Sequence, residues 1–212
     1  MIDEILPRIY DITCRESDDR RYRAFFSTAG VPTLIDTGFE DTMDALFAGI
    51  EQIGVDPERL IITHGHADHA EGFDAVVEEY GVETWVPETT ELAVDHKPDN
   101  RYGDGQTIGR FEAVHVPGHA PGNSALIDED AGIAILADVV FGSDLRGLPS
   151  GYPILPPRVY SDDLNEAELN LRKLEAYEFD TALVFHGSSL IEDAHEKLNR
   201  YINFPGKPTV DD

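Results

Sequence analysis

Four potential metal ligands follow one short apolar run, and this clustering constrains the fold of the chain more than any other feature. The run Arg59–Thr63 is typical of a buried strand, and it leads directly into His-Gly-His-Ala-Asp-His, which begins at His64. Side chains alternate along extended backbone, so we expect His64 and His66 to share one side. Asp68 and His69 then turn toward a neighbouring position as a helix begins. Because imidazoles and carboxylates suit zinc, iron or manganese, the pattern predicts a metal site where this strand ends.

A single cysteine, Cys14, narrows the chemistry of such a site. One cysteine excludes an internal disulfide framework and a zinc site built from thiolates. A site of histidines and carboxylates leaves coordination positions open to water, which a closed structural zinc site does not.

Three later motifs occur in an order that resembles the metallo-β-lactamase superfamily, whose signature is H-x-H-x-D-H after a strand. That family takes a further histidine from a Pro-Gly-His turn, here Pro117-Gly118-His119. It takes an aspartate from the end of another apolar strand, here Asp138, and a last histidine before a glycine, here His186. The resemblance implies an α/β (α+β) fold, an αββα sandwich of two mixed β-sheets flanked by helices, formed by a single domain over residues 1–212.

The same resemblance implies two divalent metal ions, for which zinc is favoured and iron and manganese are alternatives. By this resemblance, His64, His66 and His119 would bind the first ion. Asp68, His69 and His186 would bind the second, and Asp138 would bridge both. A metal-bridging hydroxide would attack the substrate, and Asp68 would carry a proton to the leaving group. Asp68 and Asp138 are therefore the candidate catalytic residues.

The charge of the chain limits its partners. Asp and Glu number 42 against 16 Lys and Arg, a formal net charge of −26. This balance argues against nucleic-acid binding through a basic face and against binding to an anionic membrane. The acidic residues are spread along the chain, as in salt-adapted proteins, and favour a halophilic archaeon as the source. With no apolar stretch of membrane-spanning length and no basic-then-apolar leader, we expect a cytoplasmic protein.

Strand-like and helix-like patterns alternate along the chain, and Ser161 or Asp162 is predicted to start one of the helices, but residues 142–160 fit neither pattern. This stretch is rich in proline and glycine and is predicted to be a long irregular loop. It either covers the active site as a substrate loop or forms a surface insertion, and the sequence weighs the two equally.

The motifs Thr63-His64-x-His66 and Pro117-Gly118-His119-x-Pro-Gly are similar to those of glyoxalase II-type thioesterases, which hydrolyse acylated thiols such as S-lactoyl conjugates. Those enzymes carry a helical C-terminal extension that binds glutathione, whereas few residues follow His186 here. We therefore expect no glutathione-specific pocket. A small-molecule thioester is the favoured substrate, with a smaller thiol or an unrelated substrate as open alternatives, and the sequence leaves the oligomeric state open.

Three alternatives remain. Lactonases of the superfamily often have a tyrosine three residues after the bridging aspartate, where this chain has Phe141. A persulfide dioxygenase with one iron would use two histidines and one carboxylate, which would correspond to His64, His119 and Asp138. A non-catalytic metal-binding module is the third, and the number of ligands argues against it because a structural zinc site normally has only four.

Overall fold

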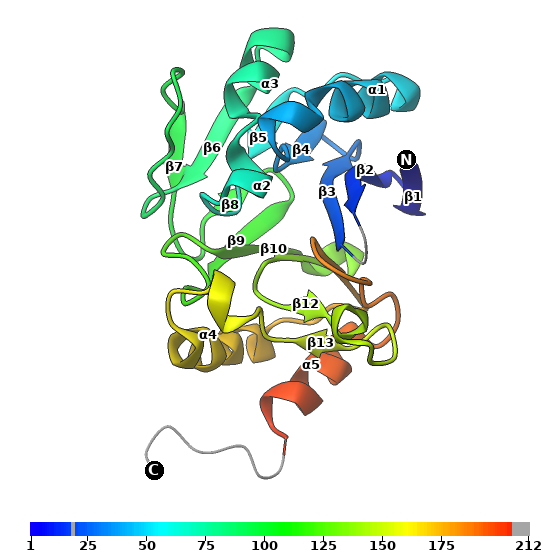
Figure 1. Ribbon diagram of the computed structural model, residues 1–212, viewed down its shortest axis with the longest axis vertical. Coiled ribbons are helices and arrows are strands. Elements are labelled where there is room, and N and C mark those ends of the chain that lie inside the picture. Colours follow the sequence, from blue (N-terminus) through cyan, green and yellow to red (C-terminus); the bar gives the residue numbers. More distant parts are fainter. Residues whose placement is uncertain (18–19, 205–212) are drawn as a thin grey trace. The chain divides into compact units, whose positions relative to one another are not determined.

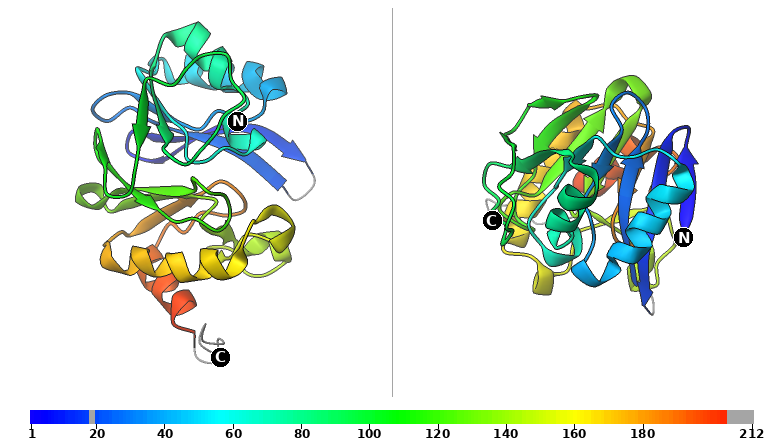
Figure 2. Two further views of the ribbon diagram at one scale, coloured as in Figure 1. Left: turned by 90° about the vertical axis from the view of Figure 1, so that its left-hand side faces the viewer. Right: turned by 90° about the horizontal axis from the view of Figure 1, so that it is seen from above.

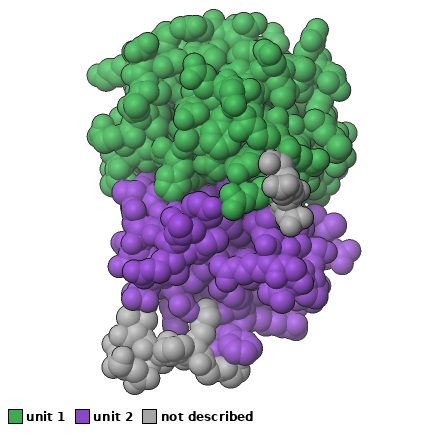
Figure 3. Space-filling model, viewed as in Figure 1, with its two compact units in different colours: residues 1–103 green, residues 104–212 purple. Residues whose placement is uncertain are grey.

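A computed structural model describes residues 1–17 and 20–204 of the chain. The chain divides into two compact units, residues 1–103 and 104–212, which Figure 3 shows in different colours. Each unit is built around its own mixed sheet and is described by itself.

The first unit contains a seven-stranded sheet whose strands follow each other in sequence order. Strands β1 to β4 pair antiparallel, and β4 to β7 pair parallel. Their bounds are β1 (Ile2–Leu6), β2 (Ile9–Ser17), β3 (Arg20–Ser27), β4 (Thr33–Ile35), β5 (Arg59–Ile61), β6 (Glu83–Pro87) and β7 (Asn100–Tyr102). The parallel strands matter most for the site, because their carboxyl ends meet at one edge of the sheet.

Two amphipathic helices, α1 (Met43–Ile53) and α3 (Phe73–Tyr80), cover one face of this sheet (Figures 1 and 2). Their apolar sides join the alternate strand residues that point the same way, including Ile12, Leu34 and Leu60. Both helices end at a glycine in the left-handed conformation, Gly54 and Gly81, as their sequences predict. A third, four-residue helix, α2 (Ala67–Ala70), carries part of the histidine motif.

The second unit contains a five-stranded sheet in the order β14-β11-β10-β9-β8. Its strands are β8 (Thr107–Ile108), β9 (Phe111–His115), β10 (Ser124–Asp128), β11 (Ile133–Ala137) and β14 (Thr181–Val184). Only β11 and β14 pair parallel, and the other pairs are antiparallel. Strands β9, β11 and β14 consequently run in the same direction, so their carboxyl ends lie at the same edge.

Helical segments cover one face of this sheet with a second apolar core (Figure 2). They are α4 (Leu164–Asn170), the 3₁₀ turns η5 (Leu171–Ala176) and α5 (Ala194–Ile202). The helix predicted to start at Ser161 or Asp162 begins at Leu164, because the Asp163 side chain accepts hydrogen bonds from the N–H groups of Asn165 and Glu166.

Residues 142–160 contain more regular structure than a wholly irregular loop. A two-stranded ribbon pairs β12 (Phe141–Gly142) with β13 (Pro153–Ile154), and two 3₁₀ turns, η3 (Ser143–Arg146) and η4 (Arg158–Tyr160), complete the segment. Within the described residues, no helix is both long and apolar enough to cross a bilayer.

Candidate metal centre

The first unit places its four candidate ligands directly after β5. Strand β5 ends at Ile61, the extended residues that follow carry His64 and His66, and α2 carries Asp68 and His69. The three imidazoles lie close together: the ring centroids of His64 and His66 are 4.7 Å apart, and those of His64 and His69 are 4.1 Å apart. An Asp68 carboxylate oxygen, Oδ2, lies 3.8 Å from Nε2 of His69.

A fully buried carboxylate, Asp36, organises this group, and no motif in the sequence had indicated it. Its Oδ1 accepts a hydrogen bond from the Thr63 backbone N–H at 2.7 Å. Its Oδ2 accepts one from the Thr63 hydroxyl at 2.6 Å and lies 2.7 Å from His69 Nδ1. Burial raises the pKa of Asp36, while His69 and Thr63 favour its charged form. A signal for it existed: Asp36 directly follows β4, the parallel neighbour of β5.

The Asp36 contacts decide which nitrogen of each imidazole is available to a metal. His69 donates its Nδ1–H to Asp36, so the Nε2 lone pair is the one that can bind a cation. Nδ1 of His64 lies 3.3 Å from the Thr63 hydroxyl oxygen. Because that hydroxyl gives its proton to Asp36, it acts as an acceptor toward His64, so Nδ1 of His64 carries the proton. The Nε2 lone pair of His64 is then the one that could bind a cation.

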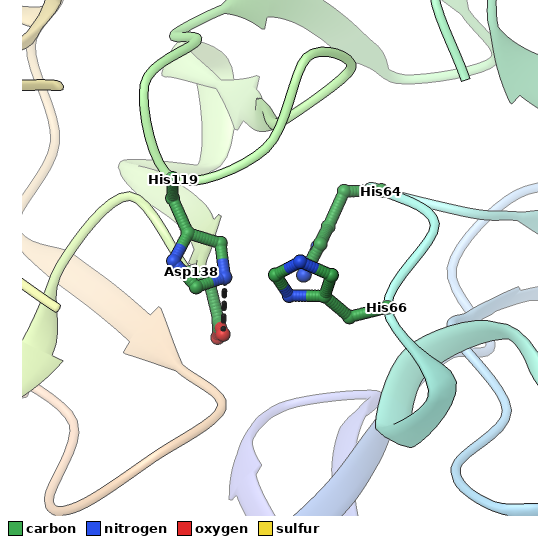
Figure 4. A group of neighbouring side chains, drawn as sticks. All are labelled: His64, His66, His119 and Asp138. Atoms are coloured by element: carbon green, nitrogen blue, oxygen red, sulfur yellow. Dashed lines mark ion pairs between the residues drawn. The ribbon is translucent and has the colours of Figure 1, made fainter. Parts of the chain in front are cut away.

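The second unit brings its three candidate ligands together at the carboxyl edge of its sheet. His119 follows β9, Asp138 follows β11 and His186 follows β14. Oδ2 of Asp138 lies 3.1 Å from Nε2 of His119 and 3.4 Å from Nε2 of His186. Figure 4 shows the first of these ion pairs, and it also shows His64 and His66 on one continuous segment of the first unit. Asp138 is only 2% exposed.

The backbone conformation next to Asp138 and His119 sets the direction of these two side chains. Ala137, next to Asp138, has a φ of 47°, and the β11–β14 register shifts between Ile135 and Ala137. A left-handed alanine is strained, and such strain is concentrated at functional sites. Gly118 has a φ of 124°, and a Cβ there would lie 2.1 Å from the backbone nitrogen of Ala167, so the turn before His119 requires glycine.

Ser161 and Phe141 of the second unit contact the candidate ligands His119 and His186 and restrict their orientation. Nδ1 of His119 lies 3.3 Å from the Ser161 hydroxyl, which donates to the carbonyl of Pro157 at 3.2 Å. The hydroxyl therefore accepts from His119 Nδ1–H, and the Nε2 lone pair is the one that could bind a cation. The Phe141 ring packs on His186, with centroids 4.6 Å apart, and on His119 at 6.2 Å. From the sequence, Ser161 was predicted only as a possible helix start.

The three histidines outside the candidate set have other partners. Nδ1 of His96 lies 3.0 Å from Oδ1 of Asp74, and Nε2 of His115 lies 2.6 Å from the carbonyl oxygen of Pro121. His195 contacts the Asn199 amide. The imidazoles grouped at the strand ends are therefore the five that the motifs predicted.

The donor set fits divalent metal ions. Each unit presents imidazole nitrogens beside a carboxylate, and the second nitrogen of His64, His69 and His119 is held by an oxygen-bearing partner. Borderline cations such as zinc prefer these ligands, and hydrogen bonds of this kind orient ligating histidines in metalloproteins.

Comparison with known proteins identifies the family. The model of the metallo-beta-lactamase superfamily matches residues 28–186, which include all seven candidate ligands. The chain belongs to this superfamily. A solved metallo-beta-lactamase from Pontibacter korlensis has a TM-score of 0.74 at 19% identity and covers 95% of this chain and 96% of its own. A metallo-beta-lactamase family protein from Thermus thermophilus has a TM-score of 0.71 at 19% identity, covering 93% and 79%. The expected fold class, mixed sheets flanked by helices, is confirmed.

Sequence relatives have a more specific name. A protein of Chelativorans sp. (strain BNC1) named hydroxyacylglutathione hydrolase is 32% identical over 77% of this chain and 62% of its own length. Another from Haemophilus influenzae, named hydroxyacylglutathione hydrolase GloC, is 28% identical over 51% and 60%. The chain thus spans about three fifths of the length of these curated relatives.

Proposed function

We propose that this protein is a metal-dependent thioester hydrolase whose seven candidate ligands form one centre for two divalent ions, most simply zinc. His64, His66 and His119 would hold the first ion, Asp68, His69 and His186 the second, and Asp138 would bridge them. Membership of the superfamily supports this assignment, as does the convergence of ligands within each unit.

The observation that carries the proposal lies within the second unit. One oxygen of Asp138 is within 3.4 Å of Nε2 of two histidines that come from different strands. The proposed assignment gives one of these histidines to each ion, so a carboxylate that serves both ions would have to face both of them, as Asp138 does. The strained Ala137 and the buried position of Asp138 are consistent with a residue held for function.

The chain's own groups then have definite roles. Divalent ions bound here would polarise the thioester carbonyl and lower the pKa of a water molecule. Asp36 and Ser161 hold the ligating imidazoles with the correct nitrogen available. Asp68, whose side chain is 19% exposed and lies near His69, would accept a proton and deliver it to the leaving thiolate. With a pKa of about 8.5, a thiol needs little help to depart, so a weak proton donor suffices.

The thioester substrate class is supported by the names of the relatives and by Phe141. Both relatives described above are named hydroxyacylglutathione hydrolases. Phe141 occupies the position of the lactonase tyrosine and packs on His119 and His186, where it offers no hydroxyl group. Because the chain covers only part of its relatives, the identity of the thiol has to follow from this chain's own residues.

The test compares Asp138→Ala with Asp130→Ala, which removes an exposed carboxylate from the same unit. In molar KCl, we expect wild type and Asp130→Ala to bind two metal ions per chain and to hydrolyse S-lactoyl thioesters. Asp138→Ala should lose bound metal and lower kcat/KM by at least about 100-fold, since one residue serves both ions. Full activity of Asp138→Ala would contradict the assignment, and one iron per chain with oxygen consumption on a persulfide would favour the dioxygenase.

A further inference from the structure

Residues 145–161 form the longest stretch of the chain without an acidic residue. The 17 positions between Asp144 and Asp162 contain two arginines and no carboxylate, although 42 of the 212 residues are Asp or Glu. Residues 113–127, another long acid-free stretch, are mostly buried, whereas much of this one is exposed. We call residues 145–161 the acid-free segment; it lies wholly within the second unit.

Both ends of the acid-free segment are fixed beside candidate metal ligands. Before its start, the Gly142 N–H donates to the His186 carbonyl at 2.8 Å, and Asp144 accepts from the Ser188 N–H and hydroxyl at 2.8 and 2.7 Å. At its end, Ser161 holds His119. The segment therefore runs between the two histidines that face Asp138, and its position is tied to the positions of these ligands.

The acid-free segment presents apolar and cationic side chains to solvent. Four of its large apolar or aromatic side chains are exposed, the most open being Val159 at 79%; the others are Leu148, Tyr152 and Tyr160. Arg146 donates to the Leu155 carbonyl, but exposed Arg158 forms no ion pair with any residue that the structure describes. Arg158 lies three residues before Ser161, and thus close in sequence to the side chain that holds His119.

On the basis of the proposed thioesterase activity, we propose that the acid-free segment binds the thiol half of the substrate and that Arg158 recognises a carboxylate on it. A guanidinium pairs with a carboxylate through two parallel hydrogen bonds, which gives specificity as well as attraction. The exposed apolar side chains contact the body of the thiol.

The charge of the whole protein strengthens this choice of ligand. At a net charge of −26, carboxylates are common along the chain and repel an anionic small molecule bound next to them, whereas residues 145–161 contribute no such carboxylate. A neutral thiol would gain nothing from the exposed guanidinium of Arg158, which forms no ion pair with any described residue, or from the lack of acidic residues in the segment. In molar salt the screening length falls to about 3 Å, so a direct Arg158–carboxylate contact persists while long-range repulsion does not.

Two substrates that differ only in charge test the proposal: the S-lactoyl thioesters of N-acetylcysteine, which has a carboxylate, and of N-acetylcysteine amide, which is neutral. Wild type should hydrolyse the anionic ester with the higher kcat/KM. Arg158→Glu should lower kcat/KM for the anionic ester about tenfold or more and leave the neutral ester within about twofold, and Arg158→Gln should have an intermediate effect. Arg172→Glu makes the same charge change at another exposed arginine of the unit and should affect neither ester.

Binding provides a readout that does not depend on catalysis. Calorimetric titration with S-(2-hydroxypropyl)-N-acetylcysteine, a thioether that cannot be hydrolysed, should show binding to wild type and to Arg172→Glu and about tenfold weaker binding to Arg158→Glu. If no thioester is hydrolysed but this difference is found, the proposed activity fails and the carboxylate site stands. Equal binding by the two glutamate variants, no binding to wild type, or an equal loss of activity on both esters would overturn the inference.

Discussion

The carboxylate of Asp36 provides the sharpest test of how the first unit prepares its ligands. In Asp36→Asn, an amide NH₂ group in the position of Oδ2 would face two donors, the Thr63 hydroxyl and His69 Nδ1–H. The hydroxyl can rotate to accept from the amide, but His69 must move its proton to Nε2 or turn away. Either change removes the nitrogen that is available to a metal.

The magnitude follows from the lost contact, the hydrogen bond from His69 to the charged carboxylate. A hydrogen bond to a charged group contributes about 1.5–3 kcal/mol, so Asp36→Asn should cost about 1.5 kcal/mol at the lower end of that range. The lower end applies because burial already raises the pKa of Asp36, which shows that its charge is costly to bury. Removing the group that orients a ligating histidine also weakens metal binding by about 10–100-fold.

A matched control separates the two effects. Asp99 also accepts hydrogen bonds from a threonine of its unit, from the N–H and the hydroxyl of Thr84, but no histidine is bound to it within the described residues. Asp36→Asn and Asp99→Asn should both lower the free energy of unfolding measured in urea. In a competition titration against a zinc chelator, only Asp36→Asn should show weaker zinc binding. Wild-type zinc affinity in Asp36→Asn, or an equal loss in Asp99→Asn, would refute the reasoning.

Three further predictions concern the fold and the charge. Gly118→Ala should lower the free energy of unfolding in urea by about 3 kcal/mol or more and weaken metal binding, because its Cβ would meet the backbone of Ala167. Gly147→Ala, at a position with a φ of 70° and no neighbouring atom within 4 Å, should cost only about 1 kcal/mol. An equal loss of stability in the two variants would contradict this reasoning. Burial, with a smaller effect of Asp11, raises the pKa of Cys14 from 9.0 to about 12. At pH 8 only about one Cys14 thiol in ten thousand is therefore ionised, and a disulfide reagent should label Cys14 only after unfolding. For the same reason stability should fall as the pH rises from 9 toward 12, and rapid labelling of the native protein would be the contrary result. Finally, molar KCl should raise Tm by about 2–4 °C for each kcal/mol of relieved repulsion, and an unchanged Tm would argue against adaptation to salt.

Local sequence signals predicted much of the secondary structure. The apolar spacing of Phe73 and Val76 with a glycine at position 81 predicts α3 with its observed end, because a left-handed glycine stops a helix whatever surrounds it. Short edge elements such as β1, β7 and β8 were not predicted, since they are interrupted by polar residues and lack the continuous apolar run that indicates the equally short β5.

The candidate ligands were predictable, but the groups that hold them were not. Each ligand sits in a short motif next to an apolar strand, which is a local pattern. Asp36 and Ser161 act across 33 and 42 positions of sequence, through contacts that exist only after parallel strand ends or a distant loop are brought together. The strained φ of Ala137 has no sequence signal, because nothing in an alanine announces a left-handed backbone.

The acid-free segment separates two tasks within one stretch of chain. The residues that fasten it, such as Asp144 and Ser161, are distinct from Arg158 and Val159, which face outward. Under the role proposed for this segment, substitutions at the outward positions would leave the fixing contacts intact. Substrate preference could then change without any change in the candidate metal ligands.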